Sequence, residues 1–95
     1  MSVVISAAVE ALSAKIAEGF DGSAKFVIEG EGGIIVDSDG VRASEEEADV
    51  TLTADADTFQ AMMSGELNPT AAFMSGRLSV DGDMGTAMRL GAALA

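Results

Sequence analysis

Apolar residues near the start of the chain recur at helical spacing. They follow one another at intervals of four, three and four positions: Ile5, Val9, Leu12 and Ile16. This spacing places all four side chains along one stripe of an α-helix, which can then pack against a core. Ser2 is a suitable N-cap for this helix, and Gly19 is a suitable residue to end it.

The pattern then changes from helical spacing to the alternation that is typical of strands. In the segment KFVIEG, Phe26 and Ile28 share one face of an extended chain. Two further strands, over residues 34–37 and 41–43, flank Asp39-Gly40, which is a strong signal for a two-residue hairpin turn. Because the connections are short, we expect these three strands to be antiparallel neighbours.

Two more alternating segments follow later in the chain. The segment VTLT places Val50 and Leu52 on one face, and LSVD does the same with Leu78 and Val80. Such alternation predicts a sheet with one buried face and one wetter face.

Short helices are expected around the last strand. The first follows Asp55, a suitable N-cap, and ends at Gly65. The second covers residues 70–75, because Asn68-Pro69 supplies a cap and a proline at the first turn. A third helix begins after Asp83.

The predicted order is a helix, a three-stranded meander, a strand, two helices, a strand and a final helix. This order indicates an α+β fold with the helices gathered on one face of a mainly antiparallel sheet. The 95 residues are expected to form one domain, residues 1–95.

Charge and composition narrow the classes of partner. The net charge of −11 at pH 7 comes from 16 acidic and five basic residues. Nucleic acid and anionic membranes attract basic surfaces, so we expect neither as a partner. The first residues lack the basic region of a signal peptide, and we expect no stable membrane insertion. The absence of cysteine fits a reducing compartment, and we expect a cytoplasmic protein.

The residues used for most enzyme chemistry are missing. The sequence has no histidine and no cysteine, which excludes the usual catalytic triads, thiolate nucleophiles and common metal sites. A serine–lysine pair with Lys15 or Lys25 remains open, although no motif supports it. Acidic pairs such as Asp37 and Asp39 do not follow the spacing of a calcium loop. We therefore expect no catalysis, no metal and no cofactor.

The second half of the chain is rich in methionine and phenylalanine. Methionine is flexible and fills irregular apolar spaces, which suits an adaptable ligand site as well as an ordinary core. Both interpretations stay open on periodicity alone. The candidate site residues are Phe59, Met62, Met63, Leu67, Phe73, Met74, Met84, Met88 and Leu90.

Three segments in the same half resemble the signature blocks of the sterol carrier protein type-2 family. They are ADVTLTADADTFQAMMSGELNP, AAFMSGRLSV and DGDMGTAMRL, in this order. The resemblance implies a five-stranded sheet covered by helices, with an apolar tunnel between them. It also implies non-catalytic binding of a fatty acid, acyl-CoA, sterol or phospholipid. Residues 59–63, 67–74 and 84–90 would line the tunnel.

Two functions from different classes follow. The leading hypothesis is a carrier that holds an acyl-type or sterol-like lipid. The alternative is an interaction or dimerisation module, accessory to a lipid- or isoprenoid-metabolising enzyme, that packs the same apolar face on another subunit. The chain ends at Ala95 without a peroxisomal address, and we expect a tunnel without a lid, which would favour this alternative or a homodimer.

Overall fold

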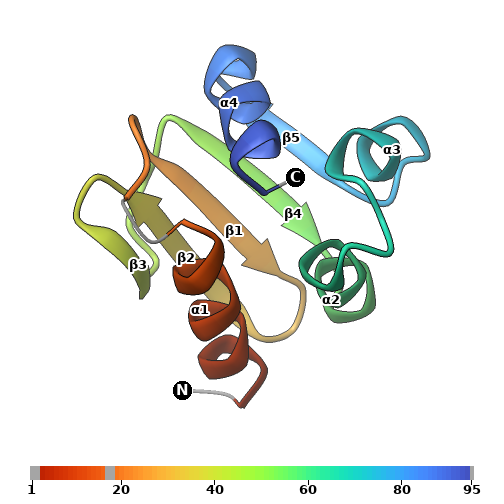
Figure 1. Cartoon of the computed structure of the whole chain (residues 1–95), viewed down its shortest axis with the longest axis horizontal. Helices are drawn as coiled ribbons and strands as arrows, with labels where there is room; N and C mark the ends of the chain where they lie inside the picture. Colours follow the sequence, from red (N-terminus) through yellow and green to blue (C-terminus); the bar gives the residue numbers. More distant parts are fainter. Residues whose placement is uncertain (1–2, 17–18, 95) are drawn as a thin grey trace.

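Five strands form one sheet with the order β3-β2-β1-β4-β5 (Figure 1). The computed structural model describes residues 3–16 and 19–94. The predicted cap Ser2 therefore lies outside the described residues. The strands are β1 (Ala24–Ile28), β2 (Gly32–Asp37), β3 (Gly40–Ala43), β4 (Val50–Ala54) and β5 (Ser79–Gly82).

The register confirms the predicted meander and adds one parallel pair. Strands β1, β2 and β3 are antiparallel neighbours, and Asp37 pairs with Gly40 across the hairpin. Strand β4 runs parallel to β1, with Phe26 opposite Leu52. Strand β5 returns antiparallel to β4. The sheet is therefore mainly antiparallel, as the sequence predicts.

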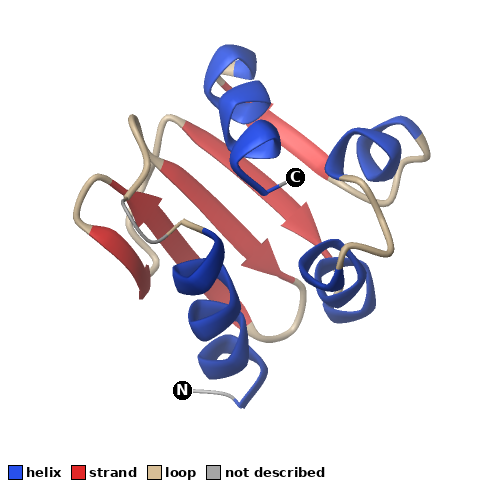
Figure 2. Cartoon of the chain, in the orientation of Figure 1, coloured by secondary structure: helices blue, strands red, loops and turns tan. Residues whose placement is uncertain are grey.

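The described residues form four helices, and they cover one face of this sheet (Figures 1 and 2). Gly19 lies just beyond the first helix, and its N–H donates to the carbonyl of Ile16 at 3.2 Å. The third helix begins at Pro69, one residue before the predicted start, because proline occupies the first helical position. The helices are α1 (Val3–Lys15), α2 (Ala56–Ser64), α3 (Pro69–Met74) and α4 (Met84–Leu94).

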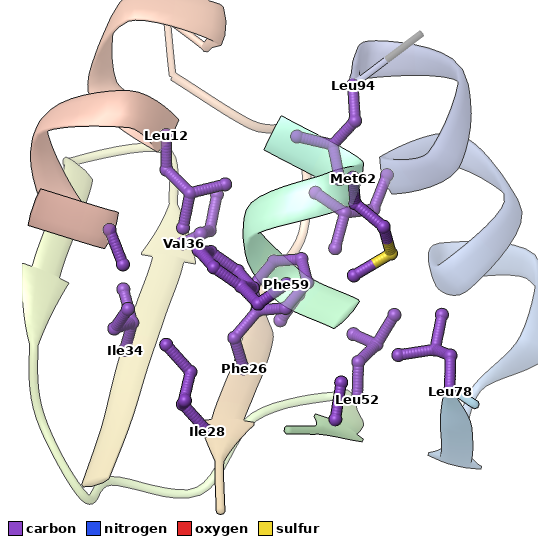
Figure 3. Packing of buried hydrophobic residues seen from close by; sticks show 14 of the residues in the cluster. Leu12, Phe26, Ile28, Ile34, Val36, Leu52, Phe59, Met62, Leu78 and Leu94 are labelled. Carbon is purple, nitrogen blue, oxygen red and sulfur yellow. The ribbon is translucent and has the colours of Figure 1, made fainter. Parts of the chain in front are cut away.

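The core fills the space between the sheet and the helices. The alternating residues of β1 and β4 point into it, as predicted, where α2 and α4 pack over them, and α1 packs on β2 and β3. Figure 3 shows members of this cluster, including Leu12 of α1, Phe26 of β1, Val36 of β2 and Phe59 of α2.

Strand β2 departs from simple alternation at Ile35. Ile34 and Val36 face the core, yet Ile35, on the opposite face, is only 2% exposed. The register places Ile35 between Lys25 and Arg42. Long basic side chains can cover apolar surface with their stems while their charged heads stay in water. The second face of the sheet is therefore not uniformly exposed to solvent.

No helix in the described part of the chain is long and apolar enough to cross a membrane. Residues 3–16 and 19–94 also contain no group of three or more acidic side chains positioned to hold a metal ion.

Candidate functional site

An apolar groove of about 630 Å³ lies between the sheet and the helices α3 and α4. Its floor comes from β1, β4 and the start of β5, and α2 contributes one side chain. Figure 3 labels Phe26, Leu52, Met62, Leu78 and Leu94 among its lining residues. The lining residues are Phe26, Leu52, Met62, Asn68, Pro69, Thr70, Phe73, Met74, Leu78, Val80, Met84, Ala87, Met88, Leu90, Gly91, Ala92 and Leu94.

Helix α2 is fixed by caps at both ends, and this places Met62 at the groove. The Asp55 carboxylate accepts a hydrogen bond from the Thr58 N–H at 2.7 Å, which satisfies one of the first-turn donors. Hydrogen bonds from Thr58 lower the pKa of Asp55. Gly65 ends the helix in the left-handed conformation, with φ of 84°. Glycine adopts this conformation without steric cost.

Helix α3 forms one wall and is tied to the strand that follows it. The side chain of Asn68 accepts from the Thr70 N–H at 2.7 Å. The carbonyl of Ala72, a fully buried residue, accepts from the N–H groups of Arg77 and Leu78 at 2.9 and 3.1 Å. This double acceptance turns the chain back under the helix and brings Leu78 onto the groove floor.

Helix α4 forms the facing wall, and its start is anchored to the residue that precedes β4. The Asp83 N–H donates to the carbonyl of Asp49 at 3.0 Å. The Asp83 carboxylate accepts from the hydroxyl of Thr86 at 2.7 Å and from the Gly85 N–H at 3.0 Å. These two bonds, the Thr86 hydroxyl first, hold the pKa of Asp83 below its usual value. Arg89 donates to the same Thr86 hydroxyl at 3.2 Å.

The two faces of α4 are chemically different. Because 3.6 residues make one turn, Met84, Met88 and Gly91 lie on the groove side of the helix. Thr86 and Arg89 lie on the opposite side, where the Arg89 guanidinium approaches Gly22. The polar network therefore holds the helix in place while its apolar face lines the groove.

The groove mouth is surrounded by exposed apolar side chains. Met74 is 80% exposed, Met88 74%, Met84 47% and Phe73 44%. Met62 and Leu90, in contrast, are buried at its base. The exposed side chains of the groove come from α3 and α4.

Six of the nine residues predicted from the sequence line this groove. They are Met62, Phe73, Met74, Met84, Met88 and Leu90. The other three do not. Phe59 is buried in the core, where its ring contacts Phe26, and Met63 and Leu67 are half-buried against the core. Met62 and Met63 are adjacent in one helix and therefore point about 100° apart, which brings only Met62 to the groove.

Sequence reasoning missed most of the floor and the end of the far wall. Phe26, Leu52, Leu78 and Val80 were interpreted only as sheet core, although alternation places them on the helix-facing side. The residue pattern gave Asn68, Pro69 and Thr70 only as a helix start, and the family resemblance alone included them, within residues 67–74, in the tunnel lining. Leu94 follows Leu90 at helical spacing, and this signal could have extended the predicted wall to the end of α4.

The described lining of the groove is almost entirely apolar. All its described lining side chains are uncharged, and only Asn68 and Thr70 carry polar side-chain groups. The serine–lysine alternative gains no support. Ser75 donates to the carbonyl of Ala72, and Lys25 pairs with Glu45 at 3.4 Å. A second, smaller hollow of about 280 Å³ near Gly33 and Glu45 lies beside that ion pair.

The comparisons with known proteins agree with one another. The family model described as the SCP-2 sterol transfer family matches residues 4–95. Hydroxysteroid dehydrogenase-like protein 2 of Danio rerio is 51% identical over 43 residues, which are 45% of this chain and 10% of that protein. Sterol carrier protein 2 of Homo sapiens is 45% identical over 47 residues, 50% of this chain and 9% of that protein. The matches thus cover about a tenth of these curated relatives.

A solved structure shows the same fold. It is the solution structure of Sterol Carrier Protein-2 from Aedes aegypti in complex with C16 fatty acid (palmitate). The TM-score is 0.78 at 20% identity, and the match covers 100% of this chain and 97% of that one. At this identity the likeness shows the fold alone.

Proposed function

Because the chain belongs to the SCP-2 sterol transfer family, we propose that it holds a single long-chain lipid in the groove between the sheet, α3 and α4 and carries it without chemical change. The observation that carries the proposal is the groove itself, an apolar space of about 630 Å³ with exposed methionine and phenylalanine side chains at its mouth. The candidate ligands are a fatty acid, an acyl-CoA, a phospholipid or a sterol-like lipid.

The energetics favour an occupied groove. Met74 and Met88 leave apolar surface in contact with water, which is unfavourable in proportion to its area. Each ligand methylene that leaves water contributes about 0.8 kcal/mol. A chain of roughly ten buried methylenes would gain on the order of 8 kcal/mol before the costs of association are subtracted. Micromolar binding, about 8 kcal/mol, is within reach of a long chain and beyond that of a short one.

The relatives support the same class of ligand. The mosquito structure is a complex with palmitate, and the human relative is named a sterol carrier. The family model describes sterol transfer. The lack of histidine and cysteine further supports a carrier over a catalyst, and a chain without cysteine is suited to the cytoplasm.

Blocking the groove tests the proposal. Gly91 lines the groove, and a Cβ at that position would have open space around it. In Gly91→Phe the new ring would fill the binding space, so a fluorescent long-chain lipid should bind at least about tenfold more weakly, a loss of about 1.4 kcal/mol. Ala93→Phe is the control, because Ala93 is exposed on the same helix and does not line the groove. If both variants bind the probe like the unmodified protein, the ligand does not lie in this groove.

The exposed mouth also supports the alternative function. Phe73, Met74, Met84 and Met88 form an apolar patch, and patches of this kind mark protein contacts as well as ligand grooves. In that case a second copy of the chain or a lipid-handling enzyme would cover them. Native mass spectrometry of the purified protein separates the two functions. A monomer that retains lipid supports the carrier, and a lipid-free dimer supports the interaction module.

A further inference from the structure

We infer that the mouth of the groove docks on a lipid surface whose headgroups carry no net charge, such as a phosphatidylcholine bilayer, and that lipid enters and leaves the groove there. The inference rests on the proposed function and names the partner of that site. The contact surface, called here the mouth face, consists of Phe73 and Met74 of α3 and Met84 and Met88 of α4.

Exposed apolar side chains are concentrated on the mouth face. Among the described residues, four of the five exposed large apolar side chains belong to it. All four also line the groove, so they surround one opening. The fifth is Val3, at the start of α1, and Figure 1 shows this end of α1 on the opposite side of the molecule from α4. An exposed apolar patch of this kind marks a surface that contacts a partner.

The charges of the chain are distributed unevenly, and acidic residues are missing from the segments that form the mouth face. Residues 67–80 and 84–94, which contain α3 and α4, hold none of the 16 acidic residues. They hold two of the five basic residues, Arg77 and Arg89. The net charge of −11 therefore comes entirely from the rest of the chain.

The two acidic residues between these segments are directed away from the groove. Val80 lines the groove, so its neighbour Asp81 lies on the opposite face of β5. The Asp83 carboxylate accepts from the Thr86 hydroxyl at 2.7 Å, on the side of α4 that faces away from the groove. No acidic residue among residues 3–16 and 19–94 lines the groove. The mouth face can therefore contact lipid without desolvating a carboxylate of the groove lining.

The same charge distribution selects among the possible partners. An anionic bilayer would repel a chain with a net charge of −11, most strongly at low ionic strength. A second copy of the chain would bring the same negative charge to the contact. A bilayer without net charge covers the exposed apolar area and adds no like-charge repulsion. It is the partner that the apolar patch and the charge distribution both favour.

Docking at the mouth shortens the path of the lipid through water. A lipid that leaves a bilayer through bulk water exposes its whole chain, and the cost rises with each methylene. With the mouth face seated on the bilayer, the chain passes directly from the bilayer into the groove. The methionine side chains suit this contact, because they are flexible and adapt to an irregular apolar surface.

Flotation with phosphatidylcholine vesicles tests the inference. Met74→Asp places a carboxylate on the mouth face, and Val3→Asp makes the same kind of change on α1, at a position that is similarly exposed, 85% against 80%. Met74→Asp should reduce the partition of the protein onto the vesicles by at least about tenfold, because apolar contact is lost and a charge is added. Val3→Asp should leave it nearly unchanged. Thermal unfolding and the binding of a fluorescent lipid without vesicles are measured for both variants.

The composition of the vesicles supplies a second comparison. Replacing part of the phosphatidylcholine by phosphatidylglycerol should weaken the binding of the unmodified protein at low salt, because both partners are then negatively charged. Added salt should remove most of this difference. Tighter binding to the phosphatidylglycerol vesicles at low salt would contradict a preference for an uncharged surface.

Three further results would overturn the inference and leave the proposed function intact, provided that the fluorescent lipid binds in solution. One is that the unmodified protein does not float with the vesicles. Another is an equal partition of Met74→Asp and Val3→Asp, which would place the contact outside the mouth face. The third is a dimer that Met74→Asp dissociates, in a protein that does not float, which would assign the mouth face to a second copy. If the fluorescent lipid does not bind the unmodified protein, the proposed function itself fails.

Discussion

Phe26 of β1 and Phe59 of α2 meet edge to face, with ring centroids 5.4 Å apart and ring planes at 76° (Figure 3). Such pairs add about 0.5–1.5 kcal/mol to the burial of the rings. Phe26 also lines the groove, whereas Phe59 does not. The pair therefore joins the groove floor to the closed core, and Phe26 belongs to both.

Truncation of Phe59 should affect stability and not ligand preference. Phe59→Ala removes a buried ring and its contact with Phe26, so we expect a loss of about 3–5 kcal/mol in urea denaturation. If that loss unfolds the domain, Phe59→Leu keeps most of the volume and allows binding to be measured. A change in the preferred chain length of the ligand in Phe59→Leu, with stability unchanged, would place Phe59 in the groove wall instead.

Truncation of a core residue should change stability, whereas truncation of a residue at the groove mouth should change ligand binding. Ile28 is 1% exposed and lies outside the groove lining, so Ile28→Ala should cost about 2–5 kcal/mol. Met88 lies at the mouth and is mostly exposed, so Met88→Ala should change stability by less than about 0.5 kcal/mol. Binding across a chain-length series should change only in the Met88 variant. Equal losses of stability with unchanged binding would show that Met88 is ordinary packing.

Met62 and Leu52 cannot separate the effect on stability from the effect on binding. Both are buried, and both line the groove. Their truncation should therefore reduce stability and alter ligand preference together.

Two glycines near and within α4 should respond oppositely to alanine. At Gly82, φ is 116° and a Cβ would lie 2.5 Å from the backbone oxygen of Asp49. Gly82→Ala should therefore destabilise the protein by about 1–3 kcal/mol. Gly91 lies inside the helix with open space around a Cβ, so Gly91→Ala should stabilise by about 0.5–1 kcal/mol. Thermal unfolding of both variants checks this, and destabilisation by Gly91→Ala would contradict the open wall described for α4.

The Asp83 network predicts a specific loss of stability in acid. The folded pKa of Asp83 is lowered by the Thr86 hydroxyl and the Gly85 N–H. The charged form therefore stabilises the fold above the unfolded pKa of about 3.9, and this contribution is lost as the pH falls through the folded pKa. Asp83→Asn should be less stable than the unmodified protein at neutral pH.

That difference should shrink as the pH falls below about 4, because the native carboxylate is then protonated too. Asp81→Asn is the control, since Asp81 is exposed and accepts no side-chain hydrogen bond from the described residues. Denaturation midpoints across this pH range test the sign. A difference between Asp83→Asn and the unmodified protein that grows in acid would contradict it.

The parts of the fold that depend on local rules could be predicted from the sequence. The caps Asp55, Asn68 and Asp83 and the hairpin at Asp39-Gly40 each act within a few residues, and each forms as expected. The parallel pairing of β1 with β4 could not be derived in this way, because it joins segments separated by more than twenty residues. Neither could the burial of Ile35, which depends on its neighbours in two other strands.

The groove was only partly predictable for a related reason. Periodicity identifies the apolar face of a helix or strand. This was sufficient to predict that Met84 and Met88 line the groove. It does not say whether an apolar residue faces closed core or open space. That distinction separates Phe59 from Met62. It depends on how the sheet packs with helices α2, α3 and α4.

The most direct test of the account uses the methionine methyl groups as reporters. Four methionines line the groove, Met62, Met74, Met84 and Met88, whereas Met63 packs against the core outside it. In a protein labelled with ¹³C at the methionine methyl groups, titration with a neutral long-chain lipid should shift the four groove signals to saturation and leave Met63 nearly unchanged. Saturable binding that moves Met63 as much as the four, or moves none of them, would contradict the claim that this groove is the lipid site.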